Sequence, residues 1–540
     1  MSNSRRPPAF LPLLAFWAAG ALCFAAACAA ATPFGTNLFF GITMSPTSPL
    51  SASQLDQLDQ AGNNWVDIQF AWSSFEPSQG QYSSTYVRQI QTAIDNALSR
   101  GWKAGLRLSW QYPPSWATQL PEARFVNQYG DLFSDTGSSG KNVVAFPFNQ
   151  NLRNIISLTM ANFFAQMQTN AGGNYLQKLS AIAFGGGFYG EVNLPDPVFN
   201  GHANCYWAYS NEAKSMFQAY LAGHYGTIGA LNSAWGRSYD SFAAAGFTPG
   251  QTSLSHRAAV DFLNWLCSVQ QQYVLFQRNL IRNAYDGYIM LELGGWGLRT
   301  NYITSNLTVD LNGSGAGADS VSKVYDFGNF LRVLSEAGES KVLANCTWID
   351  PSLSFSGPGN PAPVEWIAGF ARQYGFLSCG EYTANSTALD LGAARVNDSG
   401  LVLAFYVPAS RLFAGSYPTV ADWGNMIGRS QRAFAASVPY LLSYDIGSVG
   451  TAGSDTIAPE AISSSGAGTG YRVGAAADSF HYLAAILEGD GELVLKVNSM
   501  SADSAAQTGL MVRQGLGTGD YYTAVMLGSN QCVMQSRRSG

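Results

Sequence analysis

The chain has 540 residues, more than one ordinary domain holds, so we expect one large domain and a smaller one. With 47% hydrophobic and only 12% charged residues it is neither a disordered chain nor a coiled coil. The formal net charge of -6, from 35 acidic and 29 basic residues, leaves no basic field for a phosphate backbone. Nucleic acid is therefore not an expected partner, and a neutral, hydroxyl-rich ligand fits better.

The amino terminus has the pattern of an export signal. Arg5 and Arg6 precede an apolar, alanine-rich run over residues 9–31, which closes in three alanines before Thr32. This predicts a secretory signal peptide over residues 1–31 and a secreted or periplasmic mature protein that has no membrane segment after cleavage. A retained membrane anchor is the alternative, because the run is long enough to span a bilayer.

Cysteine and histidine usage does not indicate a metal site. The five cysteines outside the signal form no CxxC pair, and the four histidines lie far apart, so we expect no zinc and no other cofactor. Buried thiols are the default expectation. Export would permit a disulfide, whose pairing the sequence does not define. The five are Cys205, Cys267, Cys346, Cys379 and Cys532.

Short β-branched or aromatic runs alternate with longer segments of helical period from residue 38 onward. Eight such runs predict eight strands, at residues 38–43, 65–70, 103–108, 179–184, 288–293, 341–347, 375–379 and 401–406. Helices are expected between them, for example over 84–100 and 151–170, and a helical insertion over 206–235 and 257–285. The pattern predicts an α/β fold, a (β/α)8 TIM barrel over residues 32–446 with its site at the carboxyl ends of the strands.

A doubly wound open sheet is the alternative fold for this pattern. It would bind a dinucleotide through a GxGxxG turn that opens a helix. The closest candidate, Gly185-Gly186-Gly187, lacks both that spacing and the following helix. The barrel is therefore favoured.

The composition changes after the eighth unit. Residues 447–474 are rich in Gly, Ser, Ala and Thr, which predicts a linker. Over residues 475–540 the period becomes two, which predicts a small all-β, jelly-roll-like domain. It is short for a two-sheet module, so we expect it to be incomplete. Its candidate strands are 480–487, 492–497, 509–512, 521–526 and 531–534.

Two glutamates stand where barrel chemistry is expected. Glu191 follows the fourth predicted strand and Glu381 the seventh, each directly after a glycine. Cleavage of a glycosidic bond requires two opposed carboxyl groups, one that protonates the leaving oxygen and one that attacks carbon or activates water. The alternative is that both are ordinary strand-end acids, which cap helices or pair with arginine.

Other polar and aromatic residues are candidates for binding a sugar. Among the charged ones, Asp67 is either a structural partner of Arg107 or a ligand of a sugar hydroxyl, and Arg107 could instead orient a catalytic carboxylate. Glu292 and Asn193 also fall at strand ends, as does Asp350. Flat rings at the same rim could face the apolar surfaces of sugars, although each alone could be core packing. These rings are Trp72, Trp110, Tyr112, Tyr189, Trp296, Trp348 and Tyr382.

Two segments resemble a known family. Residues 70–82, FAWSSFEPSQGQY, are similar to the second-strand motif of family 42 glycoside hydrolases, and residues 217–235 are similar to the helical segment after their fourth strand. These β-galactosidase-like enzymes belong to a retaining barrel clan. The resemblance implies that Glu191 is the acid/base and Glu381 the nucleophile.

One departure points to a second family. Clan members usually carry Asn directly before the acid/base, where this chain has Gly190. Residues 187–195 instead resemble the general-acid motif of the inverting family 14 β-amylases, and residues 377–381 are similar to the strand that carries their general base. The long loop that β-amylases have after strand three is missing here. Both resemblances select the same two glutamates and differ in stereochemistry and substrate.

The carboxyl-terminal segment, residues 478–513, is similar to the front half of concanavalin-like lectin modules of secreted polysaccharide enzymes. Taken together, the sequence predicts a secreted glycoside hydrolase that cleaves β-linked, galactose-containing oligo- or polysaccharides with retention and without a cofactor. An inverting, β-amylase-like hydrolase of α-glucan and a non-catalytic carbohydrate-binding barrel are the alternatives.

Overall fold

The computed structural model describes most of the chain after the predicted signal peptide, which itself lies outside the described residues. The described residues are 34, 37–135, 142–168, 173–249, 255–299, 307–315, 317–351, 361–436, 439–458, 461–470, 477–485, 493–503, 505–528 and 531–537.

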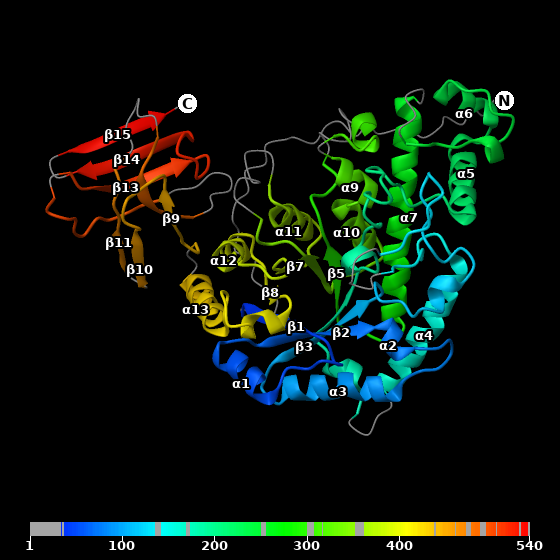
Figure 1. The fold of residues 1–540 in the computed structure, drawn as a ribbon, viewed down its shortest axis with the longest axis horizontal. Coiled ribbons are helices and arrows are strands. Elements are labelled where there is room, and N and C mark those ends of the chain that lie inside the picture. The colour runs from blue at the N-terminus through cyan, green and yellow to red at the C-terminus, as the bar shows by residue number, and fades with distance from the viewer. Residues whose placement is uncertain are drawn as a thin grey trace, which may run out of the picture. The chain divides into compact units, whose positions relative to one another are not determined.

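Eight parallel strands close into a barrel in chain order, from β1 to β8 and back to β1. Figure 1 shows them surrounded by helices. This confirms the predicted (β/α)8 fold, with each predicted strand present and its ends either unchanged or shifted by a few residues. The strands are β1 (Phe39–Met44), β2 (Trp65–Ala71), β3 (Lys103–Ser109), β4 (Ala181–Phe184), β5 (Tyr288–Leu293), β6 (Val342–Cys346), β7 (Leu377–Glu381) and β8 (Leu403–Tyr406).

The strands and helices form where their sequences bury apolar faces. All residues of β1 and β5 are buried, as expected for parallel strands covered on both sides. Helix α3 begins after Ser83, whose side chain accepts from the Tyr86 amide, and it buries one face. With α3 included, the helices around the barrel are α1 (Ala52–Gln60), α2 (Trp72–Phe75), α3 (Ser84–Leu98), α4 (Gln150–Gln168), α7 (His256–Arg282), α9 (Ala318–Lys323), α10 (Phe327–Glu336), α11 (Pro363–Gln373), α12 (Leu389–Asp398) and α13 (Val420–Ala436).

The helical insertion between β4 and β5 has a core of its own. Helices α5 (Asn211–Tyr225) and α6 (Ile228–Trp235) pack against the long helix α7 (Figure 1). Phe217 of α5 contacts both Trp235 of α6 and Trp265 of α7. The predicted helical insertion is therefore confirmed, with the first helix beginning at residue 211 rather than 206.

The carboxyl-terminal residues form small antiparallel sheets, as the period of two predicts. Strands β10 (Ser454–Ala458) and β11 (Ala461–Ser465) form one hairpin, β9 (Leu442–Ile446) pairs with β12 (Phe480–Ala484), and β13 (Gln507–Arg513), β14 (Tyr522–Gly528) and β15 (Cys532–Arg537) form a third sheet. Two predictions were wrong here. Residues 447–474 contain a hairpin, and residues 493–497 are not a strand. A lectin-like module stays a prediction.

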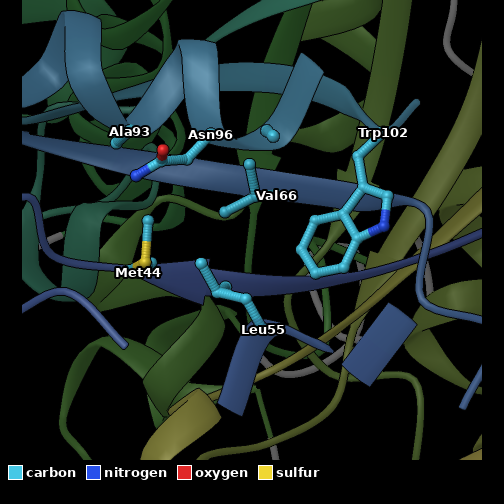
Figure 2. Close-up of a pocket in the computed structure, with 7 residues that line it drawn as sticks. Met44, Leu55, Val66, Ala93, Asn96 and Trp102 are labelled. Carbon is cyan, nitrogen blue, oxygen red and sulfur yellow. The ribbon is translucent and has the colours of Figure 1, made fainter. Parts of the chain in front are cut away.

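A small apolar space lies between β1, β2, α1 and α3 (Figure 2). None of its lining residues is a predicted site residue. They are Met44, Leu55, Val66, Ala93, Asn96, Ala97 and Trp102. Of the five cysteines, four are buried free thiols, as expected, and Cys532 is exposed. None of the described helices is both long enough and apolar enough to cross a bilayer.

His481 is expected to make the stability of the carboxyl-terminal strands depend on pH. Its Nδ1 lies 2.8 Å from Oδ1 of Asp445 and its Nε2 lies 2.9 Å from Oδ2 of Asp455. Burial lowers the pKa of His481, but the two carboxylates outweigh it and raise that pKa above its usual value. The stability that the protonated His481 contributes is fully present below the pKa that this histidine has in the unfolded chain. It is lost as pH rises through the higher pKa of His481 in the folded protein.

Scanning calorimetry at about pH 6 and about pH 9 tests this expectation. The wild-type protein should lose more Tm between the two values than His481→Gln does. Parallel losses in the two proteins would contradict it.

Candidate active site

A sharp turn after β4 places Glu191 at the barrel mouth. Residues 186, 189 and 190 have left-handed φ angles of 76°, 64° and 86°. A Cβ on Gly185 would lie 2.2 Å from the Gly190 carbonyl oxygen, so this turn requires glycine. The Val192 amide then donates to the Glu292 carbonyl on β5 at 2.9 Å, which fixes the backbone beside Glu191.

The Glu191 carboxyl group is held by two neutral donors. The Thr347 hydroxyl donates to Oε1 at 2.6 Å, and the Asn193 amide donates to Oε2 at 2.8 Å. Burial raises the pKa of Glu191 to about 7, although the Thr347 hydrogen bond and the Lys323 charge oppose that rise. Glu191 is therefore suited to hold a proton near neutral pH and to release it.

Glu381, the last residue of β7, has a charged partner instead. Its Oε2 lies 2.6 Å from Nη1 of Arg107, which extends from β3. Nε of the same guanidinium lies 2.5 Å from Oδ2 of Asp67 on β2. Burial raises the pKa of Glu381, and the Arg107 charge opposes that rise by favouring the ionised form. The Glu381 side chain keeps 13% of its surface exposed, so it can still meet a ligand.

The two glutamates lie close enough for their charges to interact, since the Glu381 charge contributes to the raised pKa of Glu191. The segment after β6 contacts both. Its Thr347 side chain donates to Glu191, and its Ile349 amide donates to the Glu381 carbonyl at 3.1 Å. Both glutamates are partly exposed. The structure therefore brings together the two residues that the sequence selected, in contrasting surroundings.

A third carboxyl group, that of Glu292, lies inside the barrel beside this pair. Its Oε2 accepts from the Asn345 amide at 2.6 Å and lies 3.5 Å from Nη1 of Arg107. Asp67 and Glu292 are 0% and 1% exposed, so the prediction that they bind sugar directly was wrong. Both instead support Arg107, and the expected Asp67–Arg107 pair is confirmed.

Three predicted sugar platforms are core residues. Trp72 packs on Trp116 and Phe146 and donates to Glu76 at 2.9 Å. Trp110 and Tyr382 are enclosed in the same way by the barrel and its helices. Trp110 donates to Gln277 at 3.1 Å, and the Tyr382 hydroxyl donates to the Leu389 carbonyl at 2.8 Å. All three rings are nearly or fully buried, so their assignment to substrate was wrong.

The remaining four rings are accessible. Tyr189 is 48% exposed, and its hydroxyl donates to Asp196 at 3.1 Å. Trp296 and Trp348 are half-buried and meet edge to face, with ring centroids 5.4 Å apart. Tyr112 is half-buried as well. Their role in binding stays a prediction. Asn193 is 2% exposed, and its side-chain amide donates to Glu191 instead of facing solvent.

Several residues that build the site could not be identified from sequence patterns. Thr347 and Asn345 are uncharged and carry no motif, although both lie at alternate positions at the end of β6, where side chains point the same way. Lys323 is remote in sequence but contributes charge to Glu191. Gly190 has a φ of 86°, and a Cβ there would lie 2.9 Å from the Gln111 side chain, so glycine suits this position.

Gly294→Ala is expected to lower kcat strongly without unfolding the chain. A Cβ on Gly294 would lie 2.0 Å from Oε2 of Glu191, so the carboxyl group must move. A shift of about 1 Å at a reacting group can reduce the rate about a hundredfold. The Gly294 backbone is not left-handed, so alanine adds no φ strain. The measurement is kcat together with Tm, on a substrate that the enzyme turns over.

Gly223→Ala is the matched control for this substitution. Gly223 lies in α5, and a Cβ there meets nothing within 4 Å. Its activity should stay at the wild-type level, and its Tm should be equal to or slightly above that of wild type, because alanine is favoured over glycine in a helix. If Gly294→Ala behaves like Gly223→Ala, the close approach of Gly294 to Glu191 has no catalytic consequence.

Comparison with known proteins supports the class of the barrel. Residues 49–168 match the family 42 glycoside hydrolase model, which is described as beta-galactosidase. The match ends before both glutamates. A thermophilic beta-amylase from Thermoanaerobacterium thermosulfurigenes is 23% identical over 268 residues, which cover 46% of this chain and 46% of that protein. The chain thus spans about half the length of this curated relative.

Two solved structures share the fold. The catalytic domain of beta-amylase from Paenibacillus polymyxa superposes with a TM-score of 0.56 at 17% identity, covering 70% of this chain and 94% of that one. A GH42 β-galactosidase from G. stearothermophilus superposes with a TM-score of 0.50 at 13% identity, covering 74% of this chain and 57% of that one.

The paired glutamates lie at the mouth of a TIM barrel, and the match over residues 49–168 supports its assignment to the glycoside hydrolases. Within that class, residues 49–168 are similar to family 42.

Proposed function

We propose that this protein hydrolyses β-linked, galactose-containing saccharides with retention of configuration, outside the cytoplasm. The observation that carries the proposal is the contrast between its two site glutamates. Glu191 is held by the neutral donors Thr347 and Asn193, and Glu381 by the Arg107 cation. One carboxyl group is thus suited to carry a proton and the other to carry a negative charge, as double displacement requires.

In the first step, ionised Glu381 attacks the anomeric carbon as the bond from that carbon to the leaving oxygen breaks. Glu191 gives its proton to that oxygen, so the alcohol leaves neutral and a glycosyl ester forms on Glu381. In the second step, Glu191 takes a proton from water while the water oxygen attacks the anomeric carbon. The ester bond breaks, the sugar is released and both carboxyl groups return to their starting states.

The surroundings of Glu191 support both of its roles. Burial keeps its proton bound to about pH 7, well above the usual range for a glutamate. Once the proton has left, the Thr347 hydroxyl and the Asn193 amide still donate to the resulting carboxylate, at 2.6 and 2.8 Å. The charged form is therefore stabilised between the two steps and can act as a base.

Accessible aromatic rings near the mouth supply the apolar part of sugar binding in this proposal. They are Tyr112, Tyr189, Trp296 and Trp348. Binding sites for small molecules are commonly lined by such rings with a few fixed polar groups among them. Substitution of Trp348 by alanine would then raise KM more than it lowers kcat.

The rate is expected to fall above about pH 7, because Glu191 must be protonated to act as an acid. Activity governed by this group is present below its pKa and lost as pH rises through it. The measurement is kcat/KM against pH, which reports the free enzyme. In Glu191→Gln, assayed with an activated aryl glycoside, this alkaline limb should disappear. A limb at the same pH in both proteins would assign it to another group.

The proposal is tested by release of reducing sugar from a panel of galactosides, glucosides, xylosides and starch, with calorimetry on the same glycans. Turnover of a β-galactoside by the wild-type protein, absent from Glu191→Gln/Glu381→Gln, is the expected result. Heat of binding without product from any glycan would instead indicate a carbohydrate-binding barrel. Export is tested separately by N-terminal sequencing of the secreted protein, which should begin near Thr32.

An inverting hydrolase of α-glucan is the second candidate. It is favoured by the beta-amylase relative and by the superposition on a beta-amylase catalytic domain. In that reaction Glu381 would activate a water as base, and no glycosyl-enzyme would form. Proton NMR of the first product distinguishes the two when its anomer is compared with that of the substrate. A β-galactoside that yields the β-anomer of galactose is cleaved with retention, whereas an α-glucan that yields a β-anomer is cleaved with inversion.

A further inference from the structure

We infer that Glu292 is an uncharged positioning residue, which carries a proton at neutral pH and leaves the Arg107 cation to Asp67 and Glu381. The inference rests on the proposed function only in assigning Glu381 as the residue that is positioned. Glu292 lies on β5, in register with Asn345 on β6, and its side chain is buried inside the barrel.

The contacts of Arg107 are unequal among its three acidic neighbours. Its nitrogens approach Asp67 and Glu381 to 2.5 and 2.6 Å, whereas Glu292 stays at 3.5 Å. Glu292 takes its short contact, 2.6 Å, from the neutral Asn345 amide instead. The Arg107 guanidinium therefore forms close ion pairs with two carboxylates, and its contact with the third, Glu292, is the longest.

The second oxygen of Glu292 also favours the uncharged form. Oε1 is buried and has no hydrogen-bond partner among the described residues. If Glu292 were ionised, this charged oxygen would be removed from water without a hydrogen bond to replace it, which is strongly unfavourable. A proton on Oε1 removes the charge and converts the oxygen to a donor.

Of the charges that face Glu292, the negative ones favour its uncharged form and the Arg107 cation opposes it. Arg107 on β3 is the positive neighbour, Asp67 on β2 and Glu381 on β7 are the negative ones, and the Cys379 thiol on β7 is kept neutral by burial, which raises its pKa. Three ionised carboxylates around one cation would carry a net charge of about -2 in a low-dielectric interior. Protonation of Glu292 halves this excess, in agreement with a pKa raised by burial to about 8.

The consequence for the reaction concerns the orientation of Glu381. While Glu292 is neutral, Nη1 of Arg107 is committed to Glu381. Once Glu292 ionises, it competes for the same nitrogen and repels the Glu381 carboxylate. Wild-type kcat should therefore fall above about pH 8 for a reason separate from the titration of Glu191.

A second buried glutamate provides a matched comparison. Glu339 lies 2.5 Å from Arg278 and 2.6 Å from Arg282, with a side chain that is 5% exposed. Burial raises the pKa of Glu339, but the two arginines outweigh it and hold that pKa below its usual value. Glu339 is thus charged where Glu292 is neutral, and replacing each with glutamine should have opposite effects.

The first test compares Tm for wild type, Glu292→Gln and Glu339→Gln from about pH 5 to about pH 8. The folded-state pKa of Glu292 is raised, so wild-type stability declines over this range and Glu292→Gln should gain Tm relative to wild type as pH rises. Glu339→Gln should be less stable than wild type at neutral pH, since it leaves two arginines without their carboxylate. A Tm loss in Glu292→Gln that matches that of Glu339→Gln and grows with pH would overturn the inference.

The second test needs no turnover, so it is independent of the proposed function. Infrared spectra of Glu191→Gln at pH 7 should retain the carbonyl band of a protonated carboxyl group, and Glu191→Gln/Glu292→Gln should lose it. Absence of that band from Glu191→Gln, or its persistence in the double variant, would overturn the inference. If turnover is found, the ratio of kcat at about pH 9 to kcat at about pH 7 should be several-fold higher in Glu292→Gln than in wild type. An equal ratio would show that Glu292 does not position Glu381.

Discussion

Glu191→Gln is expected to lower kcat/KM on a natural glycoside by about 10²–10⁴-fold, the usual loss when a general acid is removed. Glutamine keeps the shape of the side chain and can still contact Thr347 and Asn193, so the fold should survive. What it lacks is the proton that the leaving oxygen requires. Glu381→Gln should have the larger effect, because it removes the group that attacks carbon.

The choice of substrate separates the two roles. An aryl glycoside with an acidic phenol as leaving group needs little protonation, so Glu191→Gln should still form the glycosyl-enzyme rapidly on it. Glu381→Gln should remain inactive on the same substrate. Stopped-flow measurement of phenol release checks both expectations. Equal recovery of the two variants, or near-normal rates in either on the natural substrate, would show that the roles are misassigned.

Arg107→Met is expected to lower the free energy of unfolding by about 3–5 kcal/mol, the usual effect of removing one partner of a buried ion pair. Arg107 is 7% exposed and forms the close pairs with Asp67 and Glu381, so solvent screens these interactions little. Methionine fills part of the volume but leaves the carboxylates without a cation. Activity should fall as well, because Glu381 loses the cation that orients its carboxyl group and favours the ionised form.

The stability loss in Arg107→Met should depend on pH. Without the guanidinium, the folded-state pKa of each buried carboxyl group rises further above its unfolded value, so the folded variant binds more protons. Its deficit relative to wild type should therefore be larger at about pH 7.5 than at about pH 5. Urea unfolding at both values measures this.

Arg332→Met is the control for the loss of an arginine. Arg332 pairs with Glu336 one helical turn away at 2.7 Å, and the two side chains are 37% and 61% exposed. Exposed pairs of this kind contribute about 0–1 kcal/mol. Equal losses in Arg107→Met and Arg332→Met would contradict the account of a buried charge cluster.

The barrel could be predicted from sequence because parallel strands buried on both faces are short, nearly continuous apolar runs. Residues 288–293 illustrate this, since the expected strand and the observed β5 coincide. The carboxyl-terminal region was harder. Residues 493–497 are all apolar except Lys496 but form no strand, because an apolar run alone does not supply a partner edge.

The two glutamates could be predicted because Glu191 follows β4 and Glu381 ends β7, each directly after a glycine, where packing alone does not require a carboxyl group. The roles of the aromatic residues were harder to predict. A position at a strand end does not define whether a ring points to the barrel mouth or to the surrounding helices. Trp72 points inward because α2 begins there, and its indole packs against Trp116.

The supporting residues could not be predicted because their roles depend on contacts across the barrel. Thr347 is 156 residues away from Glu191, and Asn345 is 53 residues away from Glu292. Only the closed barrel brings these side chains together. Gly294 is a related case, since the need for glycine arises from the position of the Glu191 carboxyl group and not from its own φ angle.

Trapping of the glycosyl-enzyme tests the central claim most directly. A 2-deoxy-2-fluoro-β-galactoside with a good leaving group should inactivate the wild-type protein, because the fluorine slows the second step more than the first. Peptide mapping by mass spectrometry should then find the sugar on the peptide that holds Glu381. Attachment to any other residue, or continued turnover of β-galactosides without labelling, would contradict double displacement at Glu381.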